Sequence, residues 1–116
     1  MTRMAITSCP KTWVRSAGSV GDTLVIEVTD GLGDNLDGVV AVSALLEDVR
    51  GKLADVPLPA TVTDSANREV TVQLGTWLQS TAIAGQAWWV SLIITAGATT
   101  APWPEFKSDR LGLHIT

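Results

Sequence analysis

The amino-acid sequence predicts an all-β protein that folds as an antiparallel β-sandwich. Three observations support this prediction. Short segments alternate apolar with polar residues and are rich in valine, isoleucine and threonine, which is the two-residue period of half-buried strands. Clusters of Gly, Asp, Asn and Pro separate these segments. The 116 residues, 46% of them hydrophobic and 17% charged, suffice for one domain with a substantial core.

The predicted strands follow one another at short intervals with turns between them. In order along the chain they are 11–15, 23–29, 39–47, 60–63, 69–74, 86–94 and 110–116, of which 11–15 and 60–63 are the weakest. About seven short strands at this spacing are typical of an immunoglobulin-like sandwich. We divide the chain into residues 1–19, an N-terminal arm with the first edge strand, and residues 20–116, the immunoglobulin-like domain.

The alternation also predicts which side of each strong strand faces the core. The inward residues are expected to be Leu24, Ile26 and Val28; Val40, Val42, Ala44 and Leu46; Val70, Val72 and Leu74; Trp88, Val90, Leu92 and Ile94; and Leu111, Leu113 and Ile115. The segment 42–50 is also compatible with a helix. The valines at 39, 40 and 42 favour the strand, because β-branched residues suit a pleated surface.

The connections have different characters. Residues 30–38 form an Asp- and Gly-rich loop, and residues 64–68 read as a tight turn between two strands. Residues 49–59 contain Gly and two prolines and are expected to be an edge segment or a loop. Residues 75–85 lack alternation and have room for one helical turn, and residues 96–109 are expected to be a long loop.

Five tryptophans occur in a chain with no tyrosine and one phenylalanine. Trp88 is expected in the core, and Trp77 is expected to cap an open end of the sandwich. Trp89 and Ile93 fall on the outer face of strand 86–94, and Trp103 lies between two prolines that stiffen its backbone. Two explanations for Trp89 stay open: the protein's own 96–109 loop shields it together with Ile93, or another protein does.

Charge and composition argue against several classes of partner. The net charge is −4 and the eight Lys and Arg residues are scattered, so nucleic acid is not an expected partner. The apolar runs fall far short of the ~20 residues that a membrane helix needs, so no membrane partner is expected. Cys9 is the one cysteine, which excludes an internal disulfide. The N-terminus lacks the apolar stretch of a signal peptide, and we expect synthesis in a cytoplasm.

The residues give no strong sign of catalysis or metal binding. His114, the one histidine, is expected to project outward from the last strand, and no Gly-x-Ser-x-Gly motif accompanies it. Asp30, Asp34 and Asp37 share a flexible loop that could offer oxygen ligands to calcium. Their spacing is not that of an EF-hand, so a plain acidic turn is favoured. We therefore expect a protein that is not an enzyme and uses no cofactor.

Four stretches and the closing strand carry a resemblance to a known domain. They are GDTL (21–24), NLDGVVAV (35–42), DSANREVTVQLG (64–75) and AIAGQAWWVSLII (82–94), followed by RLGLHIT (110–116). Together they resemble the immunoglobulin-like N-terminal domain of upper baseplate proteins, and related tail-fibre anchoring domains, of tailed bacteriophages. The resemblance covers about residues 20–116. It implies a virion structural protein that is docked on a capsid, neck, tail or baseplate and has no cofactor.

Taken together, the residues and the resemblance predict a structural accessory protein of a tailed bacteriophage virion, made in the host cytoplasm. It is expected to dock on a tail, baseplate, neck or capsid component through an apolar, tryptophan-bearing surface. The residues expected to bind the partner are Trp89, Ile93, Trp103, Phe106 and Trp13. Other virion proteins and further copies of the chain are the expected partners. The N-terminal arm is expected to become ordered on docking.

The alternative function is a carbohydrate-binding β-sandwich that attaches a particle to host glycans. In that case Trp103 would be the platform on which a sugar ring stacks.

Overall fold

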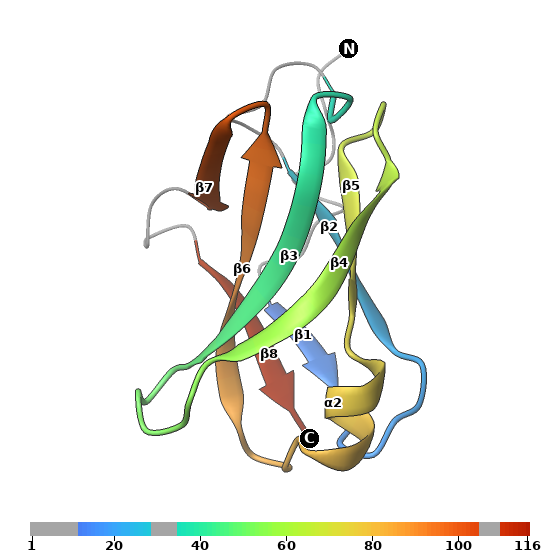
Figure 1. The fold of residues 1–116 in the computed structure, drawn as a ribbon. Coiled ribbons are helices and arrows are strands. Elements are labelled where there is room, and N and C mark those ends of the chain that lie inside the picture. Colours follow the sequence, from blue (N-terminus) through green and yellow to red (C-terminus); the bar gives the residue numbers. More distant parts are fainter. Residues whose placement is uncertain (1–11, 29–34, 105–109) are drawn as a thin grey trace.

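The computed structural model describes residues 12–28, 35–104 and 110–116 and confirms the predicted all-β fold (Figure 1). The strands curl into a nearly closed, barrel-like sandwich. The elements of the described residues are β1 (Thr12–Arg15), β2 (Thr23–Glu27), β3 (Val39–Asp48), β4 (Val56–Asp64), β5 (Glu69–Gln73), α2 (Gly75–Ser80), β6 (Ala87–Ala96), β7 (Thr99–Trp103) and β8 (Leu111–Ile115). The strand predicted at 39–47 is confirmed over the helical alternative.

The strands are hydrogen-bonded in the order β1-β8-β6-β3-β4-β5-β2, and β7 pairs with β6 as well. Strand β4 belongs to both layers of the sandwich. Its first half, 56–59, pairs with β3, and its second half, 60–64, pairs with β5. One layer therefore contains β1, β8, β7, β6 and β3, and the other contains β5 and β2. Together these two layers form the sandwich.

One pair departs from the predicted antiparallel arrangement. Strand β1 runs parallel to β8, with Trp13 opposite Leu113. Parallel neighbours need a long connection, and the whole domain separates β1 from β8 in the chain. Alternation within a strand determines its faces but not the direction of its neighbour, so the sequence pattern did not reveal this pairing.

The core residues follow the predicted two-residue alternation with one exception. Leu24, Ile26, Val72 and Leu113 are among the residues that are 1% exposed or less. Val40 was expected to face inward but is 70% exposed. The pairing of β3 with β6 shifts register between Val39 and Ala41, which is a β-bulge, and the extra residue reverses the alternation at this point.

The helical turn expected within 75–85 is confirmed as α2, and it closes one end of the sandwich (Figure 1). Trp77 and Leu78 on this helix are buried. The indole of Trp77 meets the indole of Trp88 edge to face, with ring centroids 5.5 Å apart. The predictions that Trp88 lies in the core and that Trp77 caps the sandwich are therefore confirmed.

The long loop predicted at 96–109 is wrong for its first part, because residues 99–103 form strand β7. Ala96 pairs with Thr99, so Gly97 and Ala98 make a two-residue hairpin turn. Gly97 has a φ of 62°, which a glycine at the first position of such a turn adopts without steric cost. The two threonines that follow the turn favour a strand.

The segment predicted as an edge or loop at 49–59 is divided between a turn and the start of β4. The carboxylate of Asp48 holds the turn, because it accepts hydrogen bonds from the backbone N–H groups of Arg50, Lys52 and Leu53 at 3.2, 2.9 and 3.0 Å. Burial by itself raises the pKa of this carboxyl, but these N–H donors and the charge of Arg50 outweigh it, so the pKa is lowered. The turn is therefore well anchored.

Candidate docking surface

The outer side of the layer that contains β6 carries a group of exposed and half-buried side chains. We call it the Trp89 face and define it as Leu45, Glu47, Trp89, Ile93, Pro102 and Arg110. Strand β6 lies at its centre, with β3 on one side and, on the other, β8 along residues 87–90 and β7 along residues 92–96. Because β6 has hydrogen-bonded neighbours on both sides, its outward side chains are displayed on a rigid backbone.

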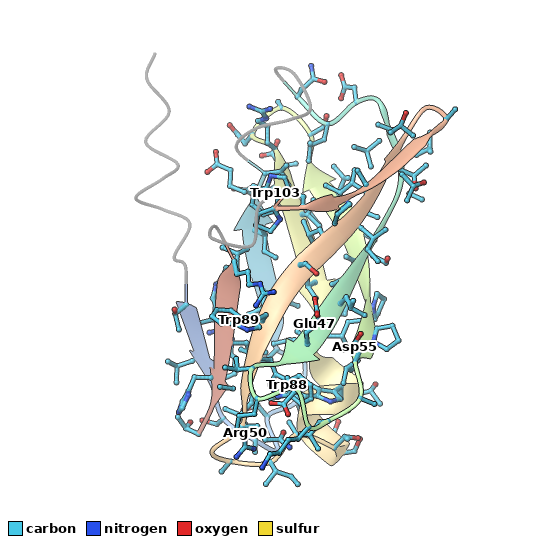
Figure 2. All side chains as sticks on the ribbon, turned by 90° about the vertical axis from the view of Figure 1, so that its left-hand side faces the viewer. Glu47, Arg50, Asp55, Trp88, Trp89 and Trp103 are labelled. Carbon is cyan, nitrogen blue, oxygen red and sulfur yellow. The ribbon has the colours of Figure 1, made fainter. Side chains whose placement is uncertain are left out.

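Trp89 is half-buried on this face, as the alternation predicts. Its neighbour on β8 is Gly112, which has no side chain, and its neighbour on β3 is Glu47. The guanidinium carbon of Arg110 lies over the indole, 5.2 Å from the ring centroid, which is a cation–π contact. Figure 2 shows Trp89 and Glu47 on this side of the molecule. The side chain of Arg110 therefore shields part of the Trp89 indole from solvent.

Ile93 is four residues further along β6 and remains 36% exposed. Its cross-strand neighbours are Ser43 on β3 and Pro102 on β7. Pro102 is itself exposed, and a proline offers no backbone N–H to water. Ile93 is therefore an exposed aliphatic side chain between the small polar Ser43 and the ring of Pro102.

Two of the expected partner-binding residues lie on the opposite side of their strands. Trp103 pairs with Leu92, which is fully buried, and paired residues project to the same side of a sheet. Trp103 accordingly packs, partly buried, against the core. Trp13 is 6% exposed and belongs to the core.

The single surface expected from five residues is thus revised. The structure brings together Trp89 and Ile93, separates Trp103 and Trp13 from them, and leaves Phe106 outside the described residues. The hairpin turn at Gly97 and Ala98 sets the register of β7 against β6, and this register determines which side of the sheet Trp103 faces. This turn was not predicted from the sequence.

The other four members of the face, Leu45, Glu47, Pro102 and Arg110, were not predicted from the sequence. Arg110 could have been found, because it alternates with Gly112 and the exposed His114. Glu47 and Pro102 reach the face only through cross-strand register, which a single sequence does not show.

The face has an uneven distribution of charge. Arg110 lies on the β8 side of Trp89, and Glu47 lies opposite Trp89 on the β3 side. Asp55, which is exposed, precedes β4 and lies beyond Glu47 in the view of Figure 2. Within the face itself, the positive Arg110 and the negative Glu47 therefore come from opposite sides of β6.

The residues considered for chemistry take up structural positions. His114 is exposed, as expected. The carboxylate of Asp37 accepts a hydrogen bond from the Ser65 hydroxyl, while Asp30 and Asp34 lie outside the described residues. Within 12–28, 35–104 and 110–116, no three His, Cys, Asp or Glu side chains are grouped as metal ligands. In the same ranges no helix is both long and apolar enough to cross a bilayer.

Comparison with family models, curated proteins and solved structures found no match to this chain. The geometry of the Trp89 face and the sequence resemblance are therefore the basis for inferring function.

Proposed function

We propose that this protein is a structural accessory protein of a tailed bacteriophage virion, and that it docks within the particle through the Trp89 face. The tail, baseplate, neck and capsid are the components on which it would dock. The observation that carries this proposal is the position of Ile93, which is 36% exposed on a rigid central strand, on the same side of β6 as the stacked Trp89 and Arg110. Tryptophan and arginine are the residues most enriched at the energetic centres of protein interfaces.

The backbone under this face supports a docking role. Strand β6 is paired along both edges, so binding would order few residues and would cost little conformational entropy. Ile93 and Pro102 offer apolar area, and Glu47 and Arg110 offer a polar rim. An apolar centre with a polar rim is the common anatomy of a protein–protein interface.

The geometry favours protein docking over the glycan-binding alternative. Sugar stacking needs an open aromatic ring, and Trp103, the expected platform, faces the core. Trp89 has polar neighbours of the kind that a sugar site uses, but Arg110 lies over its ring. A glycan array that compares the wild type with Trp89→Ala and Trp103→Ala separates the two functions. Binding that depends on either tryptophan would favour the glycan function.

The proposed function is tested by incorporation into particles. Wild-type chain, Ile93→Glu and Val25→Glu are each produced in cells that assemble the particle, and the copies per purified particle are counted by quantitative mass spectrometry. Val25 is the matched control, because it is an exposed aliphatic residue, 47% exposed, on a strand of the other layer.

We expect wild type and Val25→Glu at the same fixed stoichiometry and Ile93→Glu reduced about tenfold or more, because a carboxylate would be buried without a partner. Equal incorporation of all three would contradict docking through the Trp89 face. Absence of the wild-type chain from the particles would contradict the virion role.

A further inference from the structure

We propose that the partner of the Trp89 face is a second copy of this chain, bound about a two-fold axis that runs along β6. This inference rests on the proposed docking role of the face and names the partner there. A two-fold interface brings the same patch of both copies together, so the patch must be complementary to itself. The charges on the Trp89 face meet this requirement.

The complementarity follows from the order of residues across the sheet. Arg110 lies on the β8 side of the central Trp89, and Glu47 lies on the β3 side. A half-turn about an axis along β6 exchanges the two sides. The arginine of each copy then faces the glutamate of the other, and the two Ile93 side chains lie near the axis.

The charge pattern also selects the direction of this axis. A half-turn about an axis across the strands would leave each flank facing its own kind, arginine near arginine and glutamate near glutamate. Either axis leaves the strands of the two copies nearly aligned, but only the axis along β6 brings opposite charges together. Face-to-face sheets commonly pack with their strands within about 30° of each other.

The size of the face predicts a weak dimer. At any point along β6 the face is three strands wide, with the strands about 4.8 Å apart, and the ten residues of β6 rise about 3.3 Å each, which gives a face of roughly 500 Å² per copy. Two such faces bury roughly 1,000 Å², which is at the lower limit for a specific interface. We therefore expect association at micromolar concentration or above, which the high local concentration in a symmetric particle would favour.

The test is sedimentation velocity of the full chain from micromolar concentration to about 0.5 mM. We expect the wild type and Val25→Glu to form dimers with the same dissociation constant, and we expect Ile93→Glu to raise that constant at least tenfold. A wild-type chain that stays monomeric throughout, or an Ile93→Glu chain that dimerises like Val25→Glu, would overturn the proposal.

A charge exchange tests the contact between the copies without depending on Ile93. Glu47→Arg and Arg110→Glu are each expected to raise the dissociation constant about threefold to tenfold, and the double variant is expected to recover most of that loss. A double variant no better than the two single variants would overturn the proposed axis. Circular dichroism of each variant confirms that its monomer is folded.

The outcomes distinguish this inference from the proposed function. If the wild type is monomeric but Ile93→Glu is still lost from particles, the face docks on a different protein and the dimer is wrong. If dimers form through the face but Ile93→Glu particles keep the chain, the dimer stands and docking on the virion through this face is wrong.

Discussion

Replacing Trp88 with alanine is expected to destabilise the protein far more than the same change at its neighbour Trp89. The two residues project to opposite sides of β6. Trp88 is 3% exposed and contacts Trp77 edge to face, whereas Trp89 is half-buried under Arg110. The pair of variants therefore compares the two sides of one strand with the same chemical change.

The structure sets the magnitude for each variant. Truncating a core tryptophan costs about 3–5 kcal/mol, and the contact with Trp77 moves the value for Trp88 toward the upper end. The buried indole N–H of Trp88 has no hydrogen-bond partner among the described residues, and its removal recovers about 1 kcal/mol or more. We expect a net loss of about 3–4 kcal/mol for Trp88→Ala. For Trp89→Ala we expect about 1–2 kcal/mol, from partial burial and the cation–π contact.

Equilibrium unfolding in urea measures the difference directly. The two losses differ by about 2 kcal/mol, so with a denaturant slope of about 1–3 kcal/mol per molar the midpoint of Trp88→Ala should lie roughly 0.7–2 M below that of Trp89→Ala. Far-UV circular dichroism is the suitable probe, because both variants remove a fluorophore. Equal midpoints, or a lower midpoint for Trp89→Ala, would refute the assignment of the two faces of β6.

Three further predictions concern the turns and the outer face. Asp48 accepts three backbone N–H bonds, and its pKa in the folded protein is lowered from the ordinary value of 3.8. The ionised carboxylate therefore stabilises the fold fully when the pH is above 3.8. This stabilisation is lost as the pH falls through the lowered pKa of the folded state. Asp48→Asn should therefore lower the thermal midpoint at pH 7, and its difference from the wild type should shrink in acid; a constant difference would contradict this. Ser65→Ala removes two hydrogen bonds of the Ser65 hydroxyl, one accepted from the Leu36 N–H and one donated to the Asp37 carboxylate. The free energy of unfolding measured in urea should fall by about 1–2 kcal/mol. Unchanged stability would contradict a stabilising role for these two bonds. Ile93→Glu should change the unfolding free energy by about 1 kcal/mol or less, and a much larger loss would assign Ile93 to the core.

Much of the fold follows from local sequence pattern. The inward positions of β2, β5, β6 and β8 follow directly from alternation, because burial of one side of a strand imposes a period of two. The valines of residues 39–47 predict the strand, but they do not predict the bulge at Val40. A bulge adds one residue to one strand of a pair, so its position depends on the partner strand as much as on the strand itself.

The parts that could not be predicted depend on contacts between distant residues. The parallel partner of β1 lies about a hundred residues away, at the other end of the described chain. For the docking surface, alternation was enough to place Trp89 and Ile93 on the outside. Glu47 joins them only through the register of β3 against β6.

Trp103 shows how one turn can change a functional interpretation. The two prolines around it suggest a displayed tryptophan, but the hairpin at Gly97 and Ala98 continues the sheet and sets Trp103 opposite Leu92. Its indole then faces the core, and Pro102 takes the outward position beside Ile93. Recognising Gly97 and Ala98, followed by two threonines, as a hairpin signal corrects the assignment.

A reconstruction of a purified particle that contains this chain tests the docking role of the Trp89 face most directly. We expect density in which Trp89 and Ile93 of every copy are buried against a neighbouring chain, with Arg110 and Glu47 at the rim of that contact. Particles in which this face points to solvent while the chain is held by another surface would contradict the account.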